Sequence, residues 1–511
     1  MTGPAGPAGS APVRAVAIAG GCIAALGASA EEVRRSAPAG AEVLGFPGGF
    51  VRPGFWDTHI HIARTGAAAR FGPMLYEARS IAEMVERLAD FARRHPKLPA
   101  IVARAGCLDE RVLAEGRLPA AEDLDRADPG RPVAVVDVNK CVLNSRAAEA
   151  AGALPEGPDW PVRVNRFLSQ ELMAQAPGGF AEDFRLGTEV LARRGVTCAV
   201  DGHTLAAQAD AVRRLDADGL LGCRAIVHPA TSWEGDLEDF QASGLSFGEE
   251  LGPLSRVGPL KILYDLFVMH RTALMTRPYR GEPHNFGRRN IPPDGLRTRL
   301  AAARERGFPV AIHVTGDRGA AEAVEAFEAE LARRVPAGSL LIHAYFPPED
   351  LPDRMAALGM GLAAQPVFLR HWAETLERFV GWERIGDFNP LDDYLAAGVT
   401  VAAGSDAPIC DFGPLAGIHA MVTRRSLSGR EWGPAHAIPR KAALDLYAGS
   451  AARLFAWSHF PGSLEVGGPA DFTVLDRDLA TCRPEEIIGA KVLATYVAGR
   501  ETYRAGAGGA D

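Results

Sequence analysis

Cysteine is scarce and scattered in this sequence. The chain of 511 residues has seven cysteines, an odd number, and no two of them form a CxxC pair. This spacing argues against a disulfide framework and against a zinc site made of cysteines. We therefore expect a chain that folds around a hydrophobic core in a reducing compartment, the cytoplasm.

Long apolar runs and excess positive charge are also missing. No stretch reaches the roughly 20 apolar residues of a membrane span, and the formal net charge is -8. Both absences argue against a membrane or nucleic-acid partner. The apolar residues 15–30 follow Arg14 as in a signal peptide, but Gly20 and Gly21 divide them, and we interpret them as a β-hairpin. We expect a small-molecule substrate, and the sequence leaves a homodimer open.

One pattern recurs from about residue 180 onward: an amphipathic helix, a glycine, then a short apolar strand. The glycines at which helices are expected to end include Gly195, Gly307, Gly359 and Gly398. The predicted strands are 53–59, 196–200, 223–228, 260–265, 309–313, 340–343, 361–365 and 399–404. Helices that alternate with parallel strands predict a TIM-type (β/α)8 barrel, with a doubly wound open sheet as the alternative.

The remaining residues predict three further parts around a barrel of residues 53–455. Residues 64–185 separate the first two strands, and we interpret them as an insertion that forms a lid over the barrel mouth. Residues 13–52 and 456–505 contain short, glycine-punctuated β segments that predict one composite β-sandwich from both chain ends. Residues 1–12 are rich in Gly, Pro and Ala and are expected to be disordered.

Histidine and aspartate recur at the predicted strand ends, where a parallel barrel gathers its functional residues. His59 and His61 are two apart, so both imidazoles point to the same side of an extended chain. His313 and His343 end two later strands, and Asp406 follows the last. Imidazole and carboxylate are usual ligands of zinc and similar ions. We predict one or two divalent metals here, although strand histidines can be core residues and Asp406 could cap a helix.

Lys261 stands out in a chain whose 55 basic residues include only five lysines. It lies inside the apolar strand at 260–265, where burial would depress its pKa and leave a nucleophilic amine. Such an amine can add CO₂ to form a carbamate that bridges two metals, which arginine cannot do. The alternative is a lysine that extends to solvent or pairs with Asp265.

These residues match a known family. The segment 53–61, Pro-Gly-Phe-Trp-Asp-Thr-His-Ile-His, resembles the opening PGxxDxHxH motif of the amidohydrolase superfamily. Segments such as 142–146, 313–318 and 404–408 are similar to the amidohydrolase-3 or YtcJ-like subgroup, which includes N-substituted formamide deformylases. The similar segments follow one another in order along nearly the whole chain.

The resemblance implies a metal site and a catalytic group. The implied metal ligands are His59, His61, carboxylated Lys261, His313, His343 and Asp406, and the implied catalytic residues are Asp406, Lys261 and His343. Candidate substrate contacts are Asn144, Asp265, Arg271 and Gln365. The chain departs from the family pattern at Ile342, Leu266 and Lys140, so the reaction class carries over better than any substrate.

The predicted function is hydrolysis of a C–N bond in a small amide, formamide or cyclic amide by a water that the metal, expected to be zinc, activates. Two alternatives stay open at this point. A decarboxylase, isomerase or esterase would keep the metal site and change the reaction. A metal-free scaffold on the same fold would have lost ligands, and the sequence retains them all. His203, His228 and His270 also lie near strand ends, as substrate contacts or as ordinary histidines.

Overall fold

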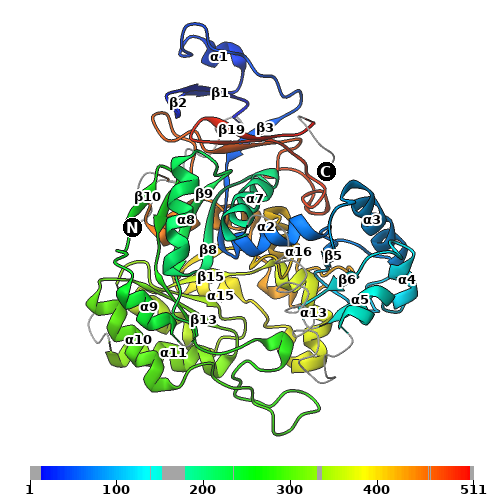
Figure 1. Cartoon of the computed structure of the whole chain (residues 1–511). Helices are drawn as coiled ribbons and strands as arrows, with labels where there is room; N and C mark the ends of the chain where they lie inside the picture. Colours follow the sequence, from blue (N-terminus) through cyan, green and yellow to red (C-terminus); the bar gives the residue numbers. More distant parts are fainter. Residues whose placement is uncertain are drawn as a thin grey trace.

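The structure is a computed structural model of the whole chain (Figure 1). It describes residues 13–138, 140–151, 179–233, 235–330, 336–457, 460 and 462–506. The tail predicted for residues 1–12 lies outside the described residues, as does part of the predicted insertion.

Eight parallel strands lie where the sequence predicts them, and they form two sheets. Their apolar side chains are buried on both faces, as expected for parallel strands covered by helices. The strands of the first sheet are β4 (Phe55–Ile60), β8 (Val196–Thr204) and β9 (Arg224–Pro229), with the short β11 (Ser255–Val257) and β10 (Glu250–Gly252) added at the edge. The second sheet holds β12 (Leu260–Leu263), β13 (Val310–Val314), β14 (Leu340–His343), β15 (Gly361–Ala364) and β16 (Thr400–Ala403).

The two sheets do not join into one closed ladder within the described residues. β11 was not predicted, and it pairs with β9 at residues 225–227, the edge that β12 would need in a closed barrel. β12 pairs with the chain of the first sheet just after the end of β9, where Ala230 and Lys261 form an isolated parallel bridge. Strand order follows the sequence from β12 to β16 without the reversal that a doubly wound sheet requires. The fold is thus a mixed α/β architecture with two sheets that are parallel except at the β10 edge of the first.

Helices connect successive strands and surround them (Figure 1). They include α7 (Gly179–Arg193), α8 (Ala206–Ala217), α10 (Pro293–Glu305), α11 (Asp317–Glu330), α12 (Leu351–Leu358) and α15 (Leu391–Ala396). Gly359 ends α12 with a φ of 68°, a left-handed conformation that glycine adopts without strain, and Gly195 between α7 and β8 has a φ of 79°. One large apolar core lies between these helices and the strands. None of the helices in the described ranges has the length and apolar character to cross a bilayer.

The segment between β4 and β8 builds a separate layer beside the strands, coloured blue to cyan in Figure 1. Its described elements are α2 (Ile62–Phe71), α3 (Ile81–Arg94), β5 (Ile101–Arg104), α4 (Ala121–Asp125), β6 (Val133–Val136), β7 (Cys141–Leu143) and α5 (Ser145–Ala151). Ser80 caps α3 by accepting a hydrogen bond from the Glu83 amide. The Glu83 carboxylate accepts from the Arg79 amide rather than from Ser80. This layer has its own apolar core.

Both ends of the described chain meet in one antiparallel sheet, at the top of Figure 1. Its strands are β3 (Phe50–Pro53), β17 (Phe472–Leu475), β18 (Val492–Val497) and β19 (Arg500–Arg504). The hairpin of β1 (Ala15–Ala19) and β2 (Cys22–Gly27), which turns at Gly20 and Gly21, packs on this sheet. Arg224 of β9 forms a buried ion pair with Asp471, 2.5 Å apart, which fixes the sheet to the strands that carry the site.

Candidate metal centre

The ends of β4 and β16 are joined by direct hydrogen bonds. The Asp406 amide donates to the His59 carbonyl at 2.7 Å, and the His61 amide donates to the Ala407 carbonyl at 3.0 Å. The Asp57 carboxylate accepts from both the Ser405 hydroxyl, at 2.5 Å, and the Ser405 amide, at 3.0 Å. These bonds fix the positions of the two chain segments that carry His59, His61 and Asp406.

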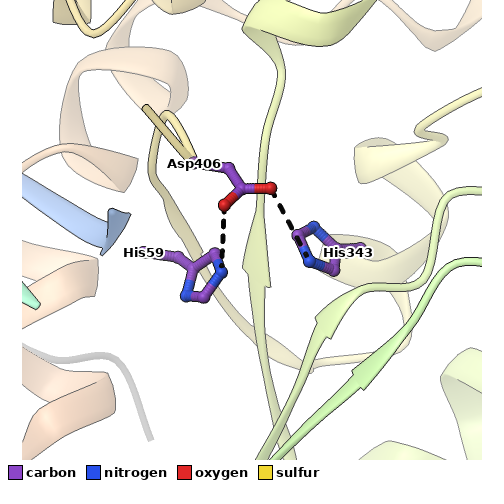
Figure 2. Close-up of side chains that lie close together, drawn as sticks. All are labelled: His59, His343 and Asp406. Atoms are coloured by element: carbon purple, nitrogen blue, oxygen red, sulfur yellow. Dashed lines mark ion pairs between the residues drawn. The ribbon is translucent and has the colours of Figure 1, made fainter. Parts of the chain in front are cut away.

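Three imidazoles surround one carboxylate, and Figure 2 shows two of them, His59 and His343, beside Asp406. Oδ1 of Asp406 lies 3.4 Å from Nε2 of His59 and 3.3 Å from Nε2 of His61, and its Oδ2 lies 4.0 Å from Nε2 of His343. His59 and His343 are each 1% exposed, whereas 16% of the His61 side chain is exposed. The cluster is therefore buried, and His61 marks the side that faces solvent.

His313 joins the cluster through His343. Nδ1 of His313 lies 2.9 Å from Nε2 of His343, so the two nitrogens converge on one point. The opposite nitrogens have partners of their own. Nε2 of His313 lies 3.2 Å from the Leu266 carbonyl, and Nδ1 of His343 lies 2.5 Å from Oε1 of Gln365 and 2.9 Å from the Tyr345 hydroxyl. Such outer contacts hold each ring with its lone pair directed inward, as in protein metal sites.

Lys261 is buried, with 3% of the residue exposed. Burial lowers its pKa to about 7, although the charges of Asp406 and Asp201 act in the opposite direction. Asp265 is not its partner, because that carboxylate accepts hydrogen bonds from the amides of Leu274, Thr315 and Gly316. The lysine neither extends to solvent nor pairs with Asp265, and both alternatives considered from the sequence are wrong.

Backbone geometry at the cluster is unusual. His343 has a φ of 77° and Asp406 a φ of 57°, left-handed conformations that non-glycine residues rarely adopt. Strain of this kind persists where surrounding contacts hold it, often at functional sites. A Cβ on Gly202 would lie 2.3 Å from Cε1 of His59, so only glycine leaves room for that ring. The sequence predicted neither the strain nor the need for Gly202.

The charge states suit a metal. Burial, and next to it the neighbouring Lys261 charge, lower the pKa of His59 to about 3 and that of His313 to about 3. Burial also lowers the pKa of His343 well below its usual range. Burial tends to raise the pKa of Asp406, but its contacts with His59 and His61 outweigh this effect and lower it. His59, His313 and His343 are thus neutral imidazoles and Asp406 an ionised carboxylate at neutral pH, the forms that bind metal.

Unsatisfied polar atoms support the same interpretation. Within the described residues, Oδ1 of Asp406 and Nδ1 of His59 are buried without a hydrogen-bond partner. Buried polar atoms are normally satisfied, so such exceptions call for an explanation. His59, His343 and Asp406 offer ligand atoms within 4.8 Å of one another. The residues therefore fit a divalent metal in both donor chemistry and spacing. Asp406 caps no helix, since α16 (Pro414–Thr423) begins after Gly413.

The four candidate substrate contacts differ in where they lie. Gln365 touches His343, and its Nε2 donates to the Ala363 carbonyl at 3.0 Å, so it orients a ring of the cluster. Asp265 is fully buried and holds together the loops after β12 and β13. Burial raises the pKa of Asp265 to about 7.

Asn144 and Arg271 have structural partners, and their contact with substrate stays a prediction. Asn144 is fully buried in the insertion and caps α5 by accepting from the Ala147 amide at 2.8 Å. Its Oδ1 also accepts from the Val133 amide, and its Nδ2 donates to the carbonyls of Asp128 and Arg131. All of its hydrogen-bonding capacity is used within the insertion. Arg271 pairs with Glu282, with Nε and Oε1 2.6 Å apart, and stacks over Phe379.

The remaining strand-end histidines fall into two kinds. His270 binds the Val138 carbonyl at 2.7 Å and so links the segment after β12 to the segment after β6. His228 is fully buried, and neither of its ring nitrogens has a hydrogen-bond partner among the described residues. Burial, followed by the charge of Lys261, lowers the pKa of His228. The sequence did not separate these cases, because both residues follow apolar residues.

Comparison with known proteins identifies one family and solved structures with a similar fold. The model of the Amidohydrolase family matches residues 47–503. An N-substituted formamide deformylase of Arthrobacter pascens is 27% identical over 96% of this chain and 95% of the deformylase. The amidohydrolase YtcJ of Bacillus subtilis (strain 168) is 25% identical over 90% of each chain. A crystal structure of a metal-dependent hydrolase from Pyrococcus horikoshii OT3 superposes with a TM-score of 0.68 at 22% identity, covering 92% of this chain and 94% of the other.

Proposed function

The chain belongs to the amidohydrolase family, and from this premise we propose that it is a metal-dependent hydrolase that cleaves a C–N bond in a small amide, formamide or cyclic amide. The observation that carries the proposal is the convergence of His59, His61 and His343 on Asp406, with His313 beside His343. The similarity to an N-substituted formamide deformylase supports the choice of a C–N bond.

The metal ligands in this proposal are His59, His61, Lys261, His313, His343 and Asp406. Imidazole and carboxylate donors without thiolates favour zinc, and one or two ions would be held. When bound, a divalent metal lowers the pKa of a water and polarises the carbonyl of a substrate. Within the described residues, Asp406 is the ionised carboxylate at the centre of the imidazoles.

Asp406 moves the proton in the proposed reaction. Its carboxylate accepts the proton of the water that attacks the carbonyl carbon, and it then returns this proton to the leaving nitrogen. The C–N bond breaks as the nitrogen becomes protonated. His343 is held by Gln365 and Tyr345, so its position does not change as charge develops. Burial of the cluster excludes bulk water from these steps.

Lys261 serves in the proposal as a metal ligand after it forms a carbamate. Its buried side chain, with a pKa of about 7, is partly a neutral amine at neutral pH. The amine would add to CO₂ and lose a proton, and the resulting carbamate would be a carboxylate-like ligand for the metal. The bridge between Ala230 and Lys261 fixes the backbone at this position.

The same family membership supports the architecture proposed from the sequence. We propose that the eight parallel strands form a TIM-type barrel of residues 53–455. The hydrogen-bond ladder of this barrel is interrupted beside β9, where β11 pairs in place of β12. Residues 13–52 and 456–505 would form the composite β module, and 64–185 the insertion that covers the site. His61, the exposed member of the cluster, would then face the substrate entrance.

The test is a hydrolysis screen with the purified full-length protein loaded with Zn²⁺. N-formyl amines, acyclic amides and cyclic amides are incubated with enzyme, and release of the amine or carboxylate is measured by chromatography. Aryl esters and carboxylic acids that can lose CO₂ serve as competing substrate classes. The proposal expects turnover confined to C–N substrates. Turnover of the esters or acids alone would contradict it.

A further inference from the structure

A second group of potential metal ligands lies outside the cluster at the strand ends. Glu77 belongs to the turn between α2 and α3, His371 to α13 (Val367–Val380), and Asp411 to the loop after β16. Each offers one ligand atom, and these atoms all lie within 4.8 Å of one another. Three segments that are far apart in sequence thus bring one imidazole and two carboxylates to one place.

His371 is the member that calls for a partner. It is fully buried, and both of its ring nitrogens lack a hydrogen bond within the described part of the chain. Its Nε2 lies 3.8 Å from Oε1 of Glu77, too far for a hydrogen bond and suited to a shared ion. A Cβ on Gly106 would lie 2.8 Å from its Nδ1, so the insertion backbone packs against that side of the ring. The free lone pair is therefore directed at the two carboxylates.

The carboxylates remain available. Asp411 is 6% exposed, and among the described residues its Oδ1 accepts one hydrogen bond, from the Gly413 amide at 2.9 Å. Glu77 is bound in a fork by Arg370, with Nε 2.9 Å from Oε1 and Nη2 2.5 Å from Oε2. Each carboxylate oxygen has more than one lone pair, so Glu77 can serve the arginine and an ion together. Arg370 also fixes the direction of Glu77, as outer contacts do at metal sites.

We propose that Glu77, His371 and Asp411 form a second divalent metal site, separate from the cluster around Asp406. One imidazole and two carboxylates favour a transition ion such as Zn²⁺, Co²⁺ or Mn²⁺ over Ca²⁺ and Mg²⁺, which prefer oxygen ligands alone. Three protein ligands leave further positions for water.

The position of the site gives it a role. Glu77 belongs to the insertion, and the neighbouring Tyr76 donates from its hydroxyl to the Pro408 carbonyl at 3.0 Å. Asp411 lies in the same loop as Asp406 and Pro408. An ion at Glu77, His371 and Asp411 therefore fastens the insertion and α13 to the loop that carries Asp406. It would stabilise the contact between these three segments.

The experiment counts metal ions in full-length protein. Protein stripped with a chelator is titrated with Co²⁺ alone, and bound cobalt is measured by elemental analysis and by its visible absorption bands. The test variant is His371→Gln with Asp411→Asn. The matched control is Asp392→Asn with His436→Gln, which alters a similar group on the surface, where Nδ1 of His436 lies 2.8 Å from Asp392. Circular dichroism checks that each variant folds.

The proposal expects the test variant to bind about one Co²⁺ fewer than wild type, and the surface control to match wild type. Equal cobalt content in the wild type and a folded test variant would overturn it. If the test variant does not fold, a second double variant, His59→Asn with His343→Asn, tests the proposal instead. It alters the cluster around Asp406 and keeps Glu77, His371 and Asp411. That variant should retain about one Co²⁺, and a folded form without cobalt would overturn the proposal.

Discussion

The cluster around Asp406 and the contact between the insertion and α13 both bury charged groups, but they treat them in opposite ways. At the contact, the fully buried Asp109 accepts from Arg111, from the Thr375 hydroxyl and from Arg378. At the cluster, by contrast, Oδ1 of Asp406 has no hydrogen bond from the described residues. Burial alone therefore does not distinguish a working site from a structural one.

The pKa values follow the same division. Burial tends to raise the pKa of Asp109, but its arginine partners outweigh this and lower it to about 2, so the carboxylate stays charged and paired. The pKa of Lys261 is lowered to about 7, chiefly by burial, so part of the amine is neutral and able to react near neutral pH. Paired charges with stabilised ionised forms indicate architecture, whereas unpaired groups near neutrality indicate chemistry.

Replacement of the central carboxylate should have the largest effect. Asp406→Asn removes the proton acceptor and a metal ligand but keeps the shape, so we expect turnover to fall by about 10³-fold. The matched control is Asp216→Asn, a buried carboxylate that accepts from Leu254 and Ser255 away from the cluster. Steady-state kinetics on the best substrate gives the measurement. An Asp406→Asn enzyme with full turnover would remove Asp406 from the mechanism.

Replacement of Lys261 should come next. Lys261→Arg keeps a positive charge but cannot form a carbamate, so we expect the metal content to fall by about one ion and activity by about 10²-fold. Lys441→Arg, at an exposed position of α17 (Arg440–Leu446), is the control. Added formate or acetate should partly restore metal binding in Lys261→Ala by supplying the missing carboxylate. Unchanged metal content in Lys261→Arg would give Lys261 a structural role instead.

Asn144 tests a structural role rather than a catalytic one, because its hydrogen bonds are to the backbone of the insertion. Asn144→Ala removes the cap of α5 and leaves the amides of Val133 and Ala147 without their acceptor. We expect the free energy of unfolding to fall by about 1–3 kcal/mol, with metal content and KM unchanged. Urea denaturation and elemental analysis of the variant supply both numbers. A raised KM at unchanged stability would restore Asn144 as a substrate contact.

The smallest effect concerns pH at the contact between the insertion and α13. The folded pKa of Asp109 is about 2, below the roughly 3.9 of an unfolded aspartate. A lowered folded pKa stabilises the protein above the unfolded value, and this stabilisation is lost as pH falls from about 4 to about 2. The arginines are partly exposed, so we expect only about 1 kcal/mol. Urea denaturation of wild type and Asp109→Asn should therefore differ at pH 6, and the difference should shrink as the pH falls from about 4 towards 2; a constant difference would contradict this account.

The sequence predicted the strands and the residues at their ends because both depend on local pattern. The helix–glycine–strand repeat locates His313 and His343 without knowledge of the rest of the chain. It did not predict β11, because three residues between two longer strands carry too little signal. It also missed the group of Glu77, His371 and Asp411, whose members come from three separate segments with no shared motif.

Asn144 and Gln365 show the same limit in the predicted site. Both were proposed as substrate contacts from family resemblance, and both are fully buried. Only the structure distinguishes them, since Gln365 touches His343 whereas Asn144 satisfies the backbone of the insertion. Polar residues in similar segments can serve either purpose, and the choice depends on tertiary contacts.

The central claim is that the cluster around Asp406 is a metal centre on which hydrolysis depends. The most direct measurement follows turnover of a C–N substrate as the protein is stripped with a chelator and refilled with Zn²⁺, with zinc counted by elemental analysis at each step. We predict that activity disappears on stripping and returns in proportion to the zinc bound, and that Asp406→Asn regains none of it. Full activity in the folded, metal-free protein would contradict the claim.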